Sequence, residues 1–412
     1  MGASARTRPV AWVHGSLGYG GGERVLVEQV RALEVRGNPV DVWTTGEPGP
    51  QDLVDEVRAA NRHVRDVARV ETSDALRGLL RRRGYEAIVT CWTARAYRAA
   101  RRLDLTPFAR RPVVIETVHE RYRWCLEDYK GRRREQIDFW LATYDFRDAL
   151  ARAFSLPHER IAIARPLFPA LLPKDAERAR SAGAALRASL GIPRGALVIG
   201  YAGRISGNKS IHELIPLVGR LAVKGLDVHL VLAGRLAPRV EEYQRRLDAI
   251  AAPLMAEGGP LRGRLHLLGA VPDAQAVYAA SDVVVLLSSM EGLFPLMLVE
   301  AMALGAPVVT TDVGGIGTCL TDGVDAAVVR KVPDDELPAT REVVSAFERR
   351  VESLLRDESE RRRLAVAGAA RVRNLIAAND FHADTVAGYE RAVALGRLRR
   401  SGALRRPAAV AS

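Results

Sequence analysis

Two cations stand five residues apart in the segment 201–215, which leaves a predicted strand, turns through glycine and enters a predicted helix. Arg204 and Lys209 would therefore lie at the carboxyl end of a parallel strand, beside a helix N-terminus, where phosphate groups commonly bind. Each charge-assisted hydrogen bond there would contribute about 1.5–3 kcal/mol. The pattern suits a diphosphate, although the spacing alone is equally compatible with a solvated surface loop.

Two carboxylates mark a second segment, residues 288–309. Glu291 lies in a loop after a predicted strand, and Glu300 lies in the helix that follows. Because the neighbours of Glu300 include Leu298 and Val299, we expect its side chain to be buried or half-buried. A carboxylate at such a position needs a hydrogen-bond partner. The two hydroxyl groups of a ribose would supply one.

Strand and helix patterns alternate along the first half of the chain. A strand at 9–14, a glycine-rich loop at 15–22, a helix at 23–36 and a strand at 39–44 make one β-α-β unit. Further apolar runs are typical of buried parallel strands. They cover residues 87–91, 112–118, 139–143 and 160–164.

A second series of strands follows a stretch rich in Pro, Ala and Arg at 166–193, which we interpret as a linker. The strands are expected at 197–203, 228–233, 265–269, 283–287, 307–310 and 326–329. The pattern predicts an α/β protein with two doubly wound, Rossmann-like domains. The expected parts are a first domain at 1–170, a linker at 171–195, a second domain at 196–378, a C-terminal helix at 379–395 that packs back on the first domain, and a disordered basic tail at 396–412.

The composition narrows the function classes. A chain of 412 residues is long enough for two domains, and its net charge of +12 suits an anionic substrate, membrane or nucleic acid, or a set of solvated helix faces. An aromatic content of 6% and the absence of RNP-like or zinc-finger patterns argue against nucleic acid. Three isolated cysteines, no signal-peptide pattern and no apolar run of about 18 residues predict a cytoplasmic protein.

The two charged segments resemble the donor-binding core of the large group 1 family of retaining GT-B glycosyltransferases, which includes bacterial mannosyl- and N-acetylglucosaminyltransferases and sucrose synthases. That family carries a Gly-Arg-x4-Lys stretch, matched by Gly203, Arg204 and Lys209, and a Glu-x7-Glu stretch, matched by Glu291 and Glu300. Segments 20–25, 269–272 and 279–282 also resemble the family. The resemblance implies a GT-B fold, with two Rossmann-like domains facing across a cleft.

The resemblance also implies roles in binding a UDP- or GDP-sugar. Arg204 and Lys209 would neutralise the diphosphate, Glu300 would bond the ribose, and Glu291 would face the sugar hydroxyls. His119 matches a family histidine near the donor sugar, although a histidine there is by itself more often structural. The other donor-binding residues implied are Gly20, Gly21 and Gly22 in the first loop, Val271 against the base, and Gly292, Leu293, Phe294, Pro295 and Leu296 around sugar and phosphate.

A metal-free hexosyl transfer follows from the same resemblance. Departure of the diphosphate builds negative charge, which fixed cations stabilise, and the sequence has no Asp-x-Asp metal motif. We therefore expect no metal and no cofactor, with the nucleotide sugar as co-substrate and retention of configuration at the sugar.

The sequence departs from the family pattern at two places. The carboxylates have eight residues between them instead of seven, so the position of Glu291 is less secure than that of Glu300. Residues 164–168, Ala-Arg-Pro-Leu-Phe, replace a frequent Pro-Asn-Gly or Asn-Pro turn at the end of the first domain, which puts the linker geometry in doubt.

Other functions stay open at this point. A sugar-nucleotide epimerase of similar fold would bind the same donor, as would a non-catalytic nucleotide-sugar-binding protein; a phosphorylase is disfavoured because no pyridoxal-binding lysine is evident. The acceptor would be a small molecule, a glycan or a lipid-linked compound. An arginine-rich region would hold a phosphorylated acceptor, touch the anionic inner face of a membrane, or simply be solvated. It comprises Arg95, Arg98, Arg101, Arg102, Arg110, Arg111, Arg121, Arg123, Lys130, Arg132, Arg133 and Arg134.

Overall fold

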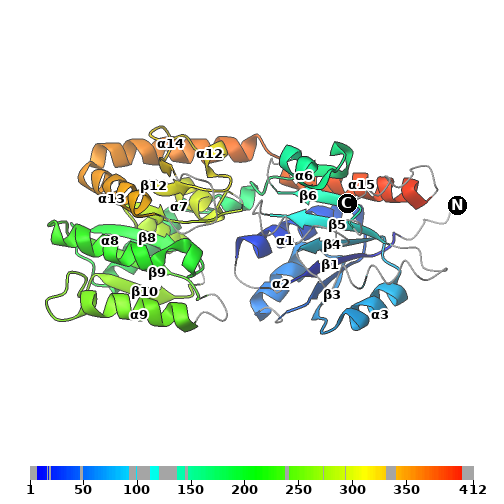
Figure 1. The fold of residues 1–412 in the computed structure, drawn as a ribbon, viewed down its shortest axis with the longest axis horizontal. Helices are drawn as coiled ribbons and strands as arrows, with labels where there is room; N and C mark the ends of the chain where they lie inside the picture. Colours follow the sequence, from blue (N-terminus) through cyan, green and yellow to red (C-terminus); the bar gives the residue numbers. More distant parts are fainter. Residues whose placement is uncertain are drawn as a thin grey trace. The chain divides into compact units, whose positions relative to one another are not determined.

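The computed structural model forms two compact units, one from residues 1–166 and 380–412 and the other from residues 167–379 (Figure 1). Both units contain a parallel β-sheet, and in the described parts of the chain helices connect consecutive strands, so the predicted α/β class with two Rossmann-like domains is confirmed. The structure describes residues 7–15, 17, 20–46, 50–91, 99, 112–119, 137–143, 147–236, 241–271, 273–292, 294–330 and 340–400.

The first unit contains a seven-stranded parallel sheet in the order β3-β2-β1-β4-β5-β6-β7. Most of its strands are apolar runs that are buried on both faces, as parallel sheets require. The strand order reverses between β1 and β4, which is the switch point of a doubly wound fold. The strands are β1 (Val10–His14), β2 (Val40–Thr44), β3 (Val64–Arg69), β4 (Ala87–Cys91), β5 (Val113–Val118), β6 (Phe139–Ala142) and β7 (Ile161–Ile163).

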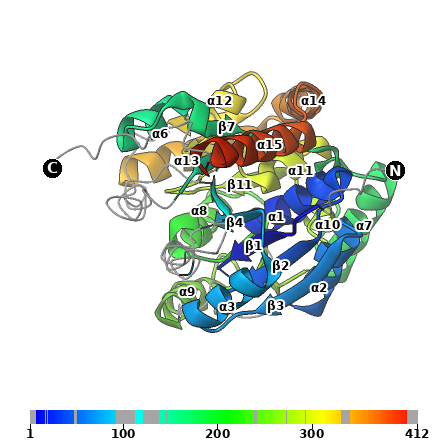
Figure 2. The same cartoon turned by 90° about the vertical axis from the view of Figure 1, so that its right-hand side faces the viewer.

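The helices of this unit include the C-terminal helix α15 (Phe381–Arg400), which lies against α1, β5 and β7 (Figures 1 and 2). His382 of α15 contacts Glu28 of α1 at 2.8 Å, and Arg397 donates a hydrogen bond of 2.9 Å to Glu86. These polar contacts fix the last helix on the sheet formed by the first part of the chain. The other helices among the described residues of this unit are α1 (Gly21–Ala32), η1 (Leu33–Arg36), α2 (Gln51–Ala60), α3 (Ser73–Arg83), α6 (Arg147–Phe154) and η3 (His158–Arg160).

The second unit contains a six-stranded parallel sheet in the order β10-β9-β8-β11-β12-β13, with its switch point between β8 and β11. The strands are β8 (Leu197–Ala202), β9 (Val228–Ala233), β10 (Leu265–Gly269), β11 (Val283–Leu286), β12 (Val308–Asp312) and β13 (Ala327–Arg330). The helices are η4 (Pro169–Leu171), α7 (Ala176–Ser189), η5 (Gly207–Lys209), α8 (Ile211–Val223), α9 (Glu241–Met255), α10 (Gln275–Ala280), α11 (Leu296–Ala303), α12 (Ile316–Cys319), α13 (Arg341–Arg356) and α14 (Glu358–Ala377).

The segment that the sequence suggested as a linker, 171–195, contains helix α7 and belongs to the second unit. Asp175 caps this helix by accepting a hydrogen bond of 2.9 Å from the amide of Arg178. Arg187 anchors it through a 2.5 Å contact with Asp282. The stretch is thus rich in alanine and arginine because both are good helix formers.

The C-terminal end of α15 also differs from the expected boundary. The helix continues to Arg400, so residues 396–400 are helical and not part of a tail. Residues 401–412, the rest of the expected tail, lie outside the described part of the chain.

Candidate functional site

The two charged segments of the sequence meet at the switch point of the second unit. Arg204 and Lys209 lie in the loop between β8 and α8, and Glu291 lies in the loop between β11 and α11. Because β8 and β11 are hydrogen-bonded neighbours, both loops leave the same edge of the sheet. This is the edge at which doubly wound domains bind their ligands.

Asn208 joins the two loops. Its backbone carbonyl accepts hydrogen bonds from the amide of Ser289, at 2.8 Å, and from the hydroxyl of Ser288, at 3.0 Å. Its side-chain amide donates to the carbonyl of Met290 at 3.4 Å, and its side-chain oxygen accepts from Ser206 Oγ at 2.6 Å. These bonds hold the residue that follows, Lys209, against the carboxylate-bearing loop.

Lys209 Nζ and Glu291 Oε1 form an ion pair. The two side chains are 17% and 11% exposed, so the pair is largely shielded from water. A third loop fixes the backbone here, because Gly314, with a φ of +60°, packs on the carbonyl of Glu291 so closely that a Cβ would lie 2.1 Å from that oxygen. The sequence assigned Lys209 to the diphosphate and Glu291 to the sugar, and did not indicate that they contact each other.

Arg204 is exposed at the same edge. Its backbone carbonyl accepts a hydrogen bond of 2.7 Å from the hydroxyl of Tyr201, which is 1% exposed. Burial, reinforced by the charge of Glu291, raises the pKa of Tyr201 well above its ordinary value, so the phenol stays protonated and remains a donor. The buried tyrosine therefore holds the backbone of a loop whose cationic side chain is accessible to a ligand.

Glu300 lies on α11 and is half-buried, as its apolar neighbours predict. The hydroxyl of Tyr278 donates to its Oε2 at 3.5 Å. Val271, expected near the base, is half-buried in the loop after β10. Of the residues expected around sugar and phosphate, Gly292, Phe294, Pro295 and Leu296 are buried at the start of α11, and Leu293 lies outside the described residues.

The N-terminus of α8 has a partner that the sequence did not indicate. The hydroxyl of Tyr243, on α9, accepts from the amide of His212 at 3.3 Å and lies 3.0 Å from His212 Nδ1. This phenol caps part of the first turn of α8. Pro295, which precedes α11, supplies no side-chain cap, so the first amides of α11 can serve a ligand.

The first unit holds His119 and the glycine-rich loop at the carboxyl ends of β5 and β1. His119 is 8% exposed, and among the described residues its Nδ1 has no hydrogen-bond partner. Burial, with a smaller contribution from His14, lowers the pKa of His119 to about 3, so its imidazole is neutral at pH 7. Gly20, Gly21 and Gly22 form the start of α1, where Gly20 provides no side-chain cap.

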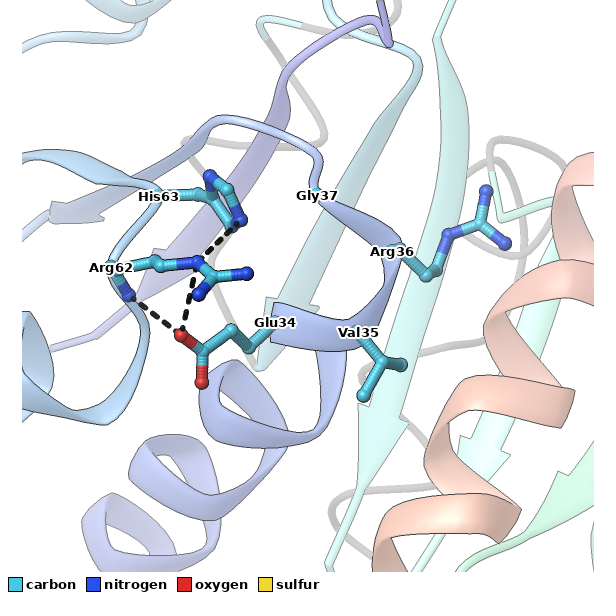
Figure 3. Close-up of a pocket in the computed structure, with 6 residues that line it drawn as sticks. All are labelled: Glu34, Val35, Arg36, Gly37, Arg62 and His63. Carbon is cyan, nitrogen blue, oxygen red and sulfur yellow. Dashed lines mark hydrogen bonds and ion pairs between the residues drawn. The ribbon is translucent and has the colours of Figure 1, made fainter.

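A shallow pocket in the first unit lies away from these residues (Figure 3). It is lined by Glu34, Val35, Arg36, Gly37, Arg62 and His63. These residues precede β2 and β3, at the amino ends of the strands, whereas doubly wound domains bind ligands at the carboxyl ends. The pocket is therefore separate from the candidate site.

In the described ranges, no group of three or more His, Cys, Asp or Glu side chains is arranged to hold a metal ion, and no helix there is both long and apolar enough to cross a membrane. The arginines and the lysine of the arginine-rich region lie outside the described residues.

Two family models match consecutive parts of the chain. Residues 19–167 match Glycosyltransferase Family 4, and residues 196–357 match Glycosyl transferases group 1. The second match contains Arg204, Lys209, Glu291 and Glu300, and the first contains His119. The matches fall on the two units and assign a glycosyltransferase domain to each.

Curated relatives match shorter stretches. A D-inositol 3-phosphate glycosyltransferase from Mycolicibacterium gilvum is 35% identical over 38% of this chain and 34% of its own length. The capsular polysaccharide biosynthesis glycosyltransferase CapM of Staphylococcus aureus is 30% identical over 43% of this chain and 41% of its own length. The chain thus spans less than half of the length of these relatives.

Solved structures resemble nearly the whole chain. HepE of Anabaena, in complex with UDP and glucose, has a TM-score of 0.68 and 18% identity, covering 96% of this chain and 99% of its own. A glycosyltransferase from Rickettsia africae has a TM-score of 0.66 and 15% identity, covering 94% and 98%. At these identities the likeness establishes the fold, which is the GT-B fold.

Proposed function

Because both units carry glycosyltransferase domains of the GT-B fold, we propose that this protein transfers a hexosyl group from a UDP- or GDP-sugar to an acceptor hydroxyl. The observation that carries the proposal is the meeting of Arg204, Lys209 and Glu291 at the switch point of the second unit, with Glu300 on the helix that follows. A diphosphate needs cations, and a ribose needs a hydrogen-bond acceptor. Both are present at this edge.

The Lys209–Glu291 pair fits a site that exchanges internal contacts for ligand contacts. In the free protein each charged group satisfies the other. When the donor binds, its diphosphate attracts Lys209, and the hydroxyl groups of its sugar donate hydrogen bonds to Glu291. As the bond to the sugar breaks, charge grows on the diphosphate, and Arg204 and Lys209 stabilise that charge more than the ground state.

The reaction proposed is metal-independent and retaining. Two fixed cations and the amides at the start of α11 perform the task that a divalent ion performs in other enzymes. A phosphate oxygen of the departing diphosphate takes the proton of the acceptor hydroxyl, so that the acceptor attacks from the face that the leaving group vacates. His119, neutral at pH 7, would offer a hydrogen bond to the donor sugar without adding charge.

Candidate substrates follow from the relatives. HepE was solved with UDP and glucose, and the named relatives include enzymes of inositol 3-phosphate and of capsular polysaccharide. UDP-glucose and a phosphorylated polyol are therefore sensible first choices. The cytoplasmic location and a contact with an anionic membrane stay predictions, which cell fractionation and liposome sedimentation would test.

The direct test is calorimetric titration with UDP, GDP and ADP and with their sugars, followed by an assay for released nucleoside diphosphate. We expect one diphosphate to bind, its release to require an acceptor, and the activity to survive EDTA. Conversion of the donor to an epimer without any acceptor would show an epimerase. Failure of every nucleoside diphosphate to bind at millimolar concentration would refute the proposed function.

A further inference from the structure

Arg235 follows β9. Its backbone lies beside that of Arg204, at the carboxyl ends of the paired strands β8 and β9. The amide of Gly203 donates to the carbonyl of Ala233 at 2.9 Å, and the amide of Ile205 donates to the carbonyl of Arg235 at 2.8 Å. Ile205 and Leu236 form a parallel bridge beyond the ends of β8 and β9. The ladder of these strands thus continues into the loops, and Arg204 and Arg235 occupy the same row of it.

The backbones at this point are locked together. Gly234 has a φ of +150°, and a Cβ there would lie 1.7 Å from the carbonyl oxygen of Gly203. Only glycine allows this approach, so the separation of Arg204 and Arg235 is set by the sheet itself. Residues in one row of neighbouring strands are about 4.8 Å apart along the hydrogen-bonding direction, and both of these side chains are exposed.

Two neighbouring cations at a ligand-binding edge repel each other, and an anion bound between them removes that repulsion. The guanidinium group is planar and matches the oxygens of a phosphate in a bidentate manner. A diphosphate presents two adjacent phosphate groups, which suit two such side chains anchored one strand apart.

The net charge of the candidate site is smaller than the charge of a diphosphate. Lys209 is paired with Glu291, so these two side chains contribute no net charge. Arg204, Lys209 and Glu291 together then carry one net positive charge against a doubly negative diphosphate, and the leaving group gains further charge as the sugar departs. A second arginine in the same row places another guanidinium group beside this position.

We propose that Arg235 is a third cationic residue of the diphosphate subsite and binds the diphosphate together with Arg204. This inference rests on the proposed function, because it assigns a further residue to the same donor site. Arg235 is absent from the motif that identifies Arg204 and Lys209, since it lies on the loop of a different strand.

The experiment measures the affinities of UDP, GDP, inorganic pyrophosphate and the corresponding nucleosides for the full chain by calorimetry. The variants are Arg235→Gln, Arg235→Lys and Arg204→Gln. Arg245→Gln is the matched control, because Arg245 is an exposed arginine on α9 of the same unit. We expect Arg235→Gln to weaken binding of the diphosphate and of pyrophosphate about tenfold or more, which is the loss of one charge-assisted contact. Arg235→Lys should recover part of that loss, and Arg245→Gln should change nothing.

Three outcomes separate the possibilities. Weaker diphosphate binding in Arg235→Gln, with an unchanged melting temperature and a smaller dependence of affinity on salt, supports the assignment. Equal weakening of the nucleoside would place Arg235 at the base and overturn it, as would wild-type diphosphate affinity in Arg235→Gln when Arg204→Gln is impaired. If the unaltered protein binds no nucleoside diphosphate, the proposed function itself fails, and this result is distinct from the other two.

Discussion

The ion pair between Lys209 and Glu291 gives the sharpest prediction, because it links stability to ligand binding. Replacing Glu291 by Gln leaves the ammonium group without its counter-charge in a region where the two side chains are only 17% and 11% exposed. Breaking a fully buried pair costs about 3–5 kcal/mol, whereas an exposed pair contributes about 0–1 kcal/mol. For this partly buried pair we expect Glu291→Gln to lower the free energy of unfolding by about 1–3 kcal/mol.

The assay is a double-mutant cycle with Lys209→Met, Glu291→Gln and the double variant, measured by urea unfolding. The double variant should be more stable than the sum of the single losses predicts, by at least about 1 kcal/mol. In nucleotide binding the two single variants should differ. Lys209→Met should weaken binding of the bare nucleoside diphosphate about tenfold or more, whereas Glu291→Gln should retain that affinity and lower kcat with the full donor.

Additive losses of stability in the cycle would show that Lys209 and Glu291 have no interaction free energy. Loss of bare nucleotide binding in Glu291→Gln, with Lys209→Met unaffected, would reverse the two roles. Either result would refute the exchange of contacts proposed for donor binding.

Three further predictions concern Glu300 and Gly314 of the second unit and His119 of the first. Glu300→Gln should weaken even a bare nucleoside diphosphate about tenfold, because a ribose hydroxyl loses a charged acceptor; calorimetry showing unchanged affinity would exclude Glu300 from the ribose. Gly314→Ala should lower both stability and kcat, because its φ of +60° and the 2.1 Å approach to the carbonyl of Glu291 leave no place for a methyl group; urea unfolding and initial rates will check this. The pKa of His119 falls from 6.5 to about 3 on folding, so the unfolded chain binds the proton first and stability is lost as the pH falls from about 6.5 towards 3. His119→Gln should make stability less dependent on pH in that window, and an unaltered dependence would contradict the shift.

Several parts of the fold were predictable because their signals are local. Buried parallel strands are continuous apolar runs, and most of those in both sheets stand out in the sequence for this reason. Strand β3 (Val64–Arg69) was missed because it is an edge strand: three of its residues are charged, and all of them are half-buried or exposed. Helix α7 was taken for a linker because its apolar face is narrow, with Ala179 and Gly183 as its buried residues.

The sequence by itself singled out the residues on which the proposed chemistry rests. The spacing of Arg204 and Lys209, and the position of Glu300 in an apolar helix, are properties of neighbouring residues, which a linear pattern preserves. Their roles as ligands stay predictions until nucleotide binding is measured.

Only the tertiary structure decided how these residues combine. Lys209 meets Glu291 across 82 residues of chain, Tyr243 reaches the start of α8 from α9, and Arg235 joins Arg204 through the pairing of β8 with β9. Such contacts depend on strand order and register, which are set by packing of the whole sheet. Periodicity reports which face of an element is buried, but it does not say which distant residue lies opposite.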